Sequence, residues 1–202
     1  MPSGVYVIVD PAVTRAPLAL LEAALRAGVS VVQLRAKDGI DRGLLGAMLD
    51  RTRTAGARLI VNDDLVAALE ADGWHAGQED LAGLELAAVR EQLGPRLLGI
   101  SCGTPAEARA AERAGADYVG TGPFAATETK ADAGRAIGVA GLSAVVAAVG
   151  IPVVAVGGIC AHNIAAVART GARMAAVISA VATAADPEAA TRSLQAAWRS
   201  AC

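Results

Sequence analysis

Residues 27–34 read Ala27-Gly28-Val29-Ser30-Val31-Val32-Gln33-Leu34, and the order of residue types at their start recurs along the chain. A small residue is followed by Gly, or by Asp-Gly, and then by a β-branched or aliphatic run. Glycine at such a point ends a helix in the left-handed conformation that it adopts without steric cost, and a buried strand begins within three residues. The other copies are Ala55-Gly56-Ala57, Ala71-Asp72-Gly73, Ala114-Gly115-Ala116 and Thr170-Gly171-Ala172. The repeat predicts the helix-to-strand turn of a βα unit.

Eight short apolar segments are typical of strands that are buried on both faces. They cover residues 5–9, 29–34, 59–61, 74–76, 97–100, 118–120, 153–156 and 174–178. Strands of this kind belong to a parallel sheet covered by helices, and the stretches between them show helical periodicity, as at Leu18, Leu21 and Leu25. We therefore predict an α/β fold, a single (β/α)₈ barrel domain over residues 1–202, with an open doubly wound sheet as the alternative.

The composition limits the function further. Apolar residues make up 54% of the 202 residues but aromatic residues only 2%, which predicts an aliphatic core without large rings. A net charge of -2 argues against a nucleic-acid partner, because phosphate backbones require a concentrated excess of Lys and Arg. The chain has no apolar run near the roughly 18 residues that span a bilayer and no leader pattern, so we expect a cytoplasmic protein without membrane contact.

Polar residues follow the expected strands one after another, and the carboxyl ends of barrel strands are where active sites form. The groups are Gln33-Leu34-Arg35-Ala36-Lys37, Asn62-Asp63-Asp64, Gln78-Glu79-Asp80, Ser101-Cys102, Thr121-Gly122-Pro123, Gly157-Gly158 and Ser179. The long irregular segment 123–137 follows the sixth strand on the same face, where its position predicts a lid over the substrates.

Three of these residues alternate along an extended backbone and so point the same way: Gln33, Arg35 and Lys37. Two cations and an amide on one face suit a doubly charged oxyanion. The alternative is a solvated strand end in which the cations pair with Asp38 or Asp41.

Asp63 and Asp80 come at the ends of neighbouring strands and can approach each other closely. Paired hard oxygen ligands, completed by water and phosphate oxygens, are what Mg²⁺ accepts, so we expect a metal site here. General acid–base chemistry by the pair and charge without a role are the alternatives. Asp64 is interpreted as the cap of the following helix.

Two glycines after the seventh strand, Gly157 and Gly158, allow backbone N–H groups to approach a phosphate, and Ser179 offers a further donor beside them. The alternative is a tight turn with Asn163 capping the next helix.

The histidines and cysteines give little indication of a catalytic role. His75 and His162 are interpreted as structural, and Cys102 beside Ser101 has no histidine near it in sequence to act as a base. Ser101 is expected to donate a hydrogen bond.

Six motifs, taken in order, resemble those of the thiamine phosphate synthase family over essentially the whole chain. They are Gln33-Leu34-Arg35-Ala36-Lys37, Asn62-Asp63-Asp64, Gly77-Gln78-Glu79-Asp80, Gly120-Thr121-Gly122-Pro123, Thr127-Glu128-Thr129-Lys130 and Gly157-Gly158-Ile159. The resemblance implies a transferase that joins 4-amino-2-methyl-5-hydroxymethylpyrimidine pyrophosphate to a thiazole phosphate, carboxylated or not. Thiamine phosphate and pyrophosphate would be the products.

The resemblance also implies a role for each matched residue. Those expected to hold the pyrimidine pyrophosphate are Gln33, Arg35, Lys37, Asn62, Ser101 and Lys130, of which Ser101, Lys130 and Arg35 would be catalytic. Those expected to hold the thiazole phosphate are Thr127, Thr129, Gly158, Ile178 and Ser179. The Mg²⁺ cofactor would lie on Asp63 and Asp80.

The resemblance also implies a dissociative reaction, which needs the leaving charge neutralised and two substrates aligned, with no strong base. The chain departs from the family at Gly103, Cys102 and Trp74, where relatives carry His, a smaller residue and an aliphatic residue. A thiazole tautomerase and a non-catalytic phosphate-binding barrel are the alternative functions. Small phosphorylated substrates are the expected partners, and the sequence leaves a homo-oligomer open.

Overall fold

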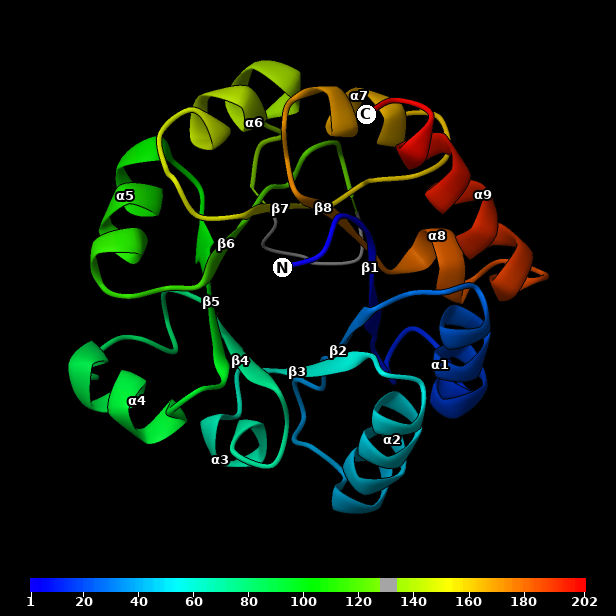
Figure 1. Cartoon of the computed structure of the whole chain (residues 1–202), viewed down its shortest axis with the longest axis horizontal. Helices are drawn as coiled ribbons and strands as arrows, with labels where there is room; N and C mark the ends of the chain where they lie inside the picture. The colour runs from blue at the N-terminus through cyan, green and yellow to red at the C-terminus, as the bar shows by residue number, and fades with distance from the viewer. Residues whose placement is uncertain (128–133) are drawn as a thin grey trace.

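Eight parallel strands close into a barrel in the computed structural model, which describes residues 1–127 and 134–202 (Figure 1). The strands are β1 (Gly4–Val9), β2 (Val31–Leu34), β3 (Arg58–Asn62), β4 (Gly73–Ala76), β5 (Leu97–Cys102), β6 (Tyr118–Thr121), β7 (Val153–Val156) and β8 (Met174–Val177). Each strand pairs with the next in the chain, and β8 returns to β1 with Met174 opposite Gly4. The predicted (β/α)₈, or TIM, barrel is confirmed, and the open sheet is wrong.

The helices form a ring outside the strands (Figure 1). They are α1 (Pro17–Arg26), α2 (Arg42–Thr54), α3 (Leu65–Ala68), α4 (Leu86–Leu93), α5 (Pro105–Arg113), α6 (Gly138–Val146), α7 (Ile164–Arg169), α8 (Ser179–Ala182) and α9 (Pro187–Arg199). Side-chain oxygens of Asp41, Asp64, Thr104 and Asp186 accept backbone N–H groups at the starts of α2, α3, α5 and α9. None of the helices described is long and apolar enough to cross a membrane.

The repeated glycine turn is largely as expected. Gly28 lies at φ 85°, and Gly56, Gly115 and Gly171 also have positive φ. Gly73 does not: it is the first residue of β4, and a Cβ there would lie 2.7 Å from the carbonyl oxygen of Leu97. The reason for glycine at this position is therefore the close approach of β5, and the prediction of a left-handed turn was wrong here.

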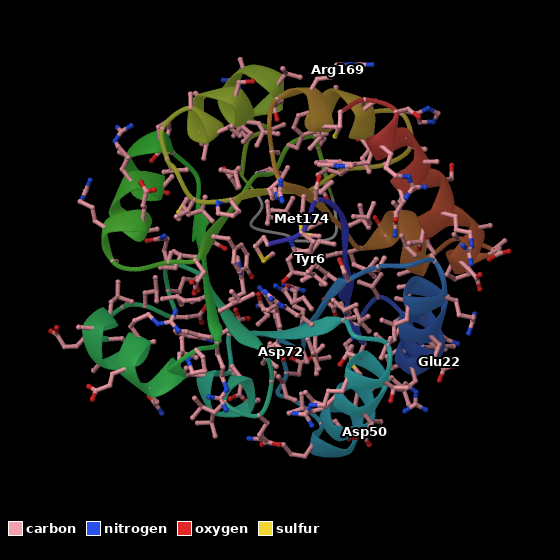
Figure 2. All side chains as sticks on the ribbon, in the orientation of Figure 1. Tyr6, Glu22, Asp50, Asp72, Arg169 and Met174 are labelled. Atoms are coloured by element: carbon pink, nitrogen blue, oxygen red, sulfur yellow. The ribbon has the colours of Figure 1, made fainter. Side chains whose placement is uncertain are left out.

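The apolar core has two layers, one inside the barrel and one between the strands and the helices. The inner layer includes Tyr6, Ile8, Tyr118 and Met174, while the larger outer layer lies between strands and helices. Figure 2 shows Tyr6 and Met174 inside the ring of strands. The expected core without large rings is wrong, because all five aromatic residues are buried: Tyr6, Trp74, Tyr118, Phe124 and Trp198.

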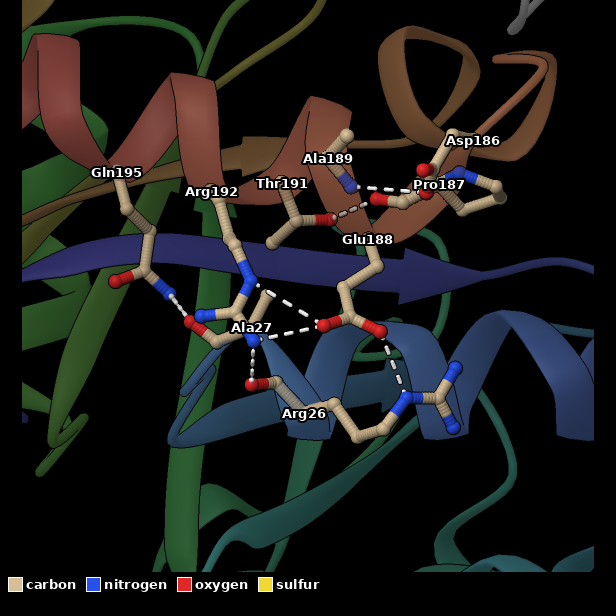
Figure 3. A network of polar contacts seen from close by, with 9 residues as sticks. All are labelled: Arg26, Ala27, Asp186, Pro187, Glu188, Ala189, Thr191, Arg192 and Gln195. Atoms are coloured by element: carbon tan, nitrogen blue, oxygen red, sulfur yellow. Dashed lines mark hydrogen bonds and ion pairs between the residues drawn. The ribbon is translucent and has the colours of Figure 1, made fainter.

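The last helix, α9, packs beside the first, α1, and its side chains contact the end of α1 (Figure 3). Glu188 on α9 accepts hydrogen bonds from Arg26 Nε and Arg192 Nη2, each at 2.7 Å. Arg192 and Gln195 donate to the carbonyl oxygens of Arg26 and Ala27 at the end of α1. These contacts satisfy carbonyl groups that a helix end leaves without a partner.

Candidate active site

A cavity of about 430 Å³ opens among the carboxyl ends of the strands and is lined by residues from all eight strands or the loops after them. Every predicted site residue in the described part of the chain lines it, namely Gln33, Arg35, Lys37, Asn62, Asp63, Asp80, Ser101, Thr127, Gly158, Ile178 and Ser179. Thr129 and Lys130 lie outside the described residues. The strand ends thus bring together side chains that are up to 146 positions apart in sequence, from Gln33 to Ser179.

The alternating residues of β2 and its following loop share the cavity, but Arg35 has a partner that the sequence reasoning did not anticipate. Its Nη1 pairs with a carboxylate oxygen of Asp10, directly after β1. The Asp10 side chain is 3% exposed and its other oxygen accepts the Ala12 amide at 2.9 Å. Arg35 therefore lines the cavity while its guanidinium is paired with the buried Asp10 carboxylate. The expected alternative partners were Asp38 and Asp41.

A chain of hydrogen bonds runs through the barrel interior, and all of its residues line the cavity. Gln33 Nε2 donates to the Tyr6 hydroxyl at 3.1 Å, and the Tyr6 and Tyr118 hydroxyls are 3.4 Å apart. His75 continues the chain, with Nδ1 3.0 Å from the Tyr118 hydroxyl and Nε2 3.0 Å from Ser101 Oγ. Two predicted site residues that lie three strands apart in the barrel, Gln33 on β2 and Ser101 on β5, are connected in this way.

The two tyrosines of this hydrogen-bond chain, and Cys102 near it, are poorly suited to ionise. Burial raises the pKa of both Tyr6 and Tyr118 well above the ordinary value of a phenol, so these groups stay protonated and neutral. Burial also raises the pKa of the Cys102 thiol to about 12, and Glu107 adds to this effect. A cysteine nucleophile therefore has no support here, as the sequence suggested.

The two expected metal ligands meet at the neighbouring ends of β3 and β4. The Asp63 pKa is raised from 3.8 to about 6, first by burial, then by the Asp80 charge and by a side-chain interaction with Asp80, so the two carboxyl groups lie close together. Asn62 and Arg35 act in the opposite direction. Asp80 is anchored in turn, since its Oδ2 accepts the Gly77 amide at 2.7 Å.

The donor set fits a magnesium ion. Two carboxylates placed this close repel each other, and a divalent cation bound between their hard oxygen atoms removes that repulsion. Residues 1–127 and 134–202 contain no group of three or more His, Cys, Asp or Glu side chains placed to hold a metal. Water and substrate oxygens would have to complete the coordination, as is usual for Mg²⁺.

The glycines after β7 serve the packing of the cavity wall. Gly158 has φ 65°, and a Cβ there would lie 2.6 Å from the Ala126 carbonyl oxygen in the loop after β6. Asn163 does not cap α7 with its side chain; it accepts the Cys160 amide and donates to the Gly158 carbonyl oxygen, which closes the turn. The turn is thus tight, as the alternative interpretation held, and it also lines the cavity.

Sequence reasoning missed four residues of this region. Asp10 follows β1 just as the other polar groups follow their strands, so the same test would have found it. Tyr6 and Tyr118 are polar tips within apolar segments, and His75 was interpreted as structural although its ring lines the cavity between two hydroxyl groups. Which residues of a strand face inward depends on closure of the barrel, and local sequence carries little of that information.

Comparison with known proteins agrees with the geometry. The family model described as thiamine monophosphate synthase matches residues 5–181. A thiamine-phosphate synthase of Moorella thermoacetica is 50% identical over 187 residues, which cover 90% of this chain and 88% of the relative. That of Roseiflexus castenholzii is 47% identical over 204 residues, with coverage of 96% and 88%.

A solved structure gives the same result. The thiamine phosphate pyrophosphorylase of Pyrococcus furiosus superposes with a TM-score of 0.88 at 34% identity, covering 98% of this chain and 96% of that one. Sequence and structure point to one group of proteins, and this chain belongs to the thiamine monophosphate synthase family.

Proposed function

We propose that this protein is a thiamine-phosphate synthase that works in the cytoplasm with Mg²⁺. It joins 4-amino-2-methyl-5-hydroxymethylpyrimidine pyrophosphate to a thiazole phosphate and releases pyrophosphate. The observation that carries the proposal is the cavity itself, where a cation pair, a carboxylate pair and neutral hydrogen-bonding groups from different strands line one space. Those are the groups that an anionic leaving group and an uncharged heterocycle require.

The pyrimidine binds beside Gln33, Asn62 and Ser101. The Gln33 amide nitrogen is engaged by Tyr6, so its amide oxygen serves the exocyclic amine of the ring. Ser101 is held by His75 and presents a neutral hydroxyl. The connected hydroxyl groups fix both contacts before the substrate enters, which lowers the cost of ordering them.

The pyrophosphate binds to Arg35, Lys37 and Lys130, the last being an expectation from the family motif. Arg35 offers a planar set of donors whose orientation Asp10 fixes. When bound by Asp63 and Asp80, Mg²⁺ supplies charge neutralisation to the phosphate oxygens. The thiazole phosphate binds opposite, to Thr127, Thr129, Gly158, Ile178 and Ser179.

The bond from the pyrimidine methylene to the pyrophosphate oxygen breaks first. The aminopyrimidine delocalises the positive charge that remains, and the thiazole nitrogen then attacks the methylene carbon. No proton has to be removed from the attacking nitrogen, which agrees with a cavity whose phenols are held protonated by burial. The protein's contribution is alignment and charge stabilisation.

The test is a reaction of the purified protein with both substrates over a range of Mg²⁺ concentrations. We expect thiamine phosphate and pyrophosphate in equal amounts, and no activity after the metal is removed with a chelator. Absence of product at every Mg²⁺ concentration would contradict the proposal. Incubation with a thiazole phosphate alone separates the tautomerase alternative, which would rearrange that substrate without the pyrimidine.

A further inference from the structure

The backbone of Asp63 adopts a conformation that side chains other than glycine rarely take. Its φ is 63°, and no other non-glycine residue in the described segments 1–127 and 134–202 has a positive φ. Aspartate tolerates this region better than most residues, but the conformation still needs support from its surroundings. Here it occurs at one of the two carboxylates expected to bind metal.

Both backbone groups of Asp63 are held by β4. The amide donates to the His75 carbonyl oxygen at 3.0 Å, and the carbonyl oxygen accepts the Trp74 indole N–H at 3.0 Å. The following residue, Asp64, is fixed as well, since its side chain accepts the Ala67 amide at 2.9 Å. Hydrogen bonds therefore hold the backbone both at Asp63 and at the residue that follows it.

Trp74 is a rigid donor. Its ring is 1% exposed and belongs to the core between strands and helices, so it has no room to change rotamer. It touches neither the cavity nor any expected substrate group, because it is absent from the cavity lining. Within segments 1–127 and 134–202, the indole N–H, which is the polar group of the side chain, donates to the Asp63 carbonyl oxygen alone.

We propose that Trp74 is a positioning residue for the metal site, whose indole N–H holds Asp63 in the left-handed conformation that turns its carboxylate toward Asp80. The inference rests on the proposed function, because it requires that the carboxylate pair binds Mg²⁺. Without the indole donor the Asp63 carbonyl oxygen loses its partner, and the bend relaxes toward an ordinary backbone conformation. Mg²⁺ then binds to a minor population, which weakens its apparent affinity by about fivefold to tenfold.

The chain offers a matched control. Trp198 on α9 is 2% exposed, and its indole N–H donates to Ser3 Oγ at 3.1 Å. Trp74→Phe and Trp198→Phe therefore remove the same group from similarly buried rings, one beside Asp63 and the other at the start of the chain. With two tryptophans in the sequence, each variant leaves a single indole signal in a ¹⁵N spectrum and so assigns it.

The experiment is a titration with Mg²⁺ alone, followed through indole and backbone amide signals of the parent and both variants. We expect Mg²⁺ to move the Trp74 indole signal and leave that of Trp198 in place. Half-saturation should need about fivefold to tenfold more Mg²⁺ in Trp74→Phe and an unchanged concentration in Trp198→Phe.

Two results would overturn the inference while leaving the magnesium site intact: equal affinity of Trp74→Phe and the parent, or a Trp74 signal in Trp198→Phe that does not move at saturation. The second measurement keeps the indole in place, so it decides the matter even if Trp74→Phe does not fold. If neither the parent nor Trp198→Phe responds to Mg²⁺, the carboxylate pair does not bind the metal by itself and the inference is wrong, whereas the Mg²⁺ dependence of the reaction is decided separately by the assay with both substrates.

Discussion

Asp10 shows how one buried carboxylate can prepare a cation for a substrate. It is 3% exposed and faces Arg35, whose side chain is 14% exposed, so neither charge is well solvated. In Asp10→Asn the amide would present hydrogens to a guanidinium that has only donors. We expect the free energy of unfolding to fall by about 3 kcal/mol, as when one partner of a buried ion pair is removed.

The measurement is urea unfolding of Asp10→Asn with and without inorganic pyrophosphate. The pyrophosphate should stabilise the variant less than the parent, because Asp10 no longer holds Arg35 in the orientation that binds it. Glu70→Gln is the control, since the Glu70–Arg42 pair is about half exposed on both sides and its loss should cost less than about 1 kcal/mol. Equal losses in the two variants would show that Asp10 does not hold Arg35.

A substitution at Asp80 can test the metal site while keeping the hydrogen bond that Asp80 makes to the Gly77 amide in the loop after β4. Its Oδ2 accepts the Gly77 amide, and an asparagine can keep that bond through its own oxygen while losing the charge. Asp80→Asn should therefore keep the parent's unfolding transition but lose at least about a hundredfold in Mg²⁺-dependent turnover, because a bound metal supplies several kcal/mol of charge stabilisation. Product formation with an unchanged Mg²⁺ requirement would remove Asp80 from the site.

At the scale of the helices, α9 is held by its apolar face more than by the polar contacts seen in Figure 3. Leu194 is 2% exposed, whereas the ion pair of Glu188 with Arg26 is solvated, with Arg26 58% exposed. Leu194→Ala should lower the free energy of unfolding by about 3 kcal/mol, through lost burial and the cavity left behind. Glu188→Gln should cost far less, and a larger loss in chemical denaturation for Glu188→Gln than for Leu194→Ala would contradict this.

The elements were largely predictable from sequence, and the reason is physical. Strands buried on both faces read as apolar runs, so all eight were found, with ends displaced by up to two residues. The site was predictable in its location because parallel strands direct their carboxyl ends to one rim. The contacts between neighbouring strands were not predicted. They are the close approach of Gly73 to Leu97, the ion pair of Asp10 with Arg35, and the hydrogen bond from Trp74 to Asp63. Each depends on neighbours that only barrel closure brings together.

For the whole molecule, the interior phenols predict how the barrel responds to alkali. Tyr6 and Tyr118 are the two tyrosines of the chain, and both lie inside the barrel. Burial raises both pKa values, so the folded state holds these protons more tightly than the unfolded chain, whose tyrosines titrate at about pH 10. Their contribution to stability is complete below that pH and declines as the pH rises above it.

We therefore expect tyrosinate absorbance to appear only as the barrel unfolds, in a single step that coincides with the loss of circular dichroism. The tyrosines of the urea-unfolded chain should titrate at about pH 10 and give the reference. In Tyr118→Phe the absorbance change should be halved, because one of the two phenols is gone. Tyrosinate that forms while the circular dichroism is still that of the folded barrel would show that the hydroxyls reach solvent, and that the connection from Gln33 to Ser101 opens without unfolding.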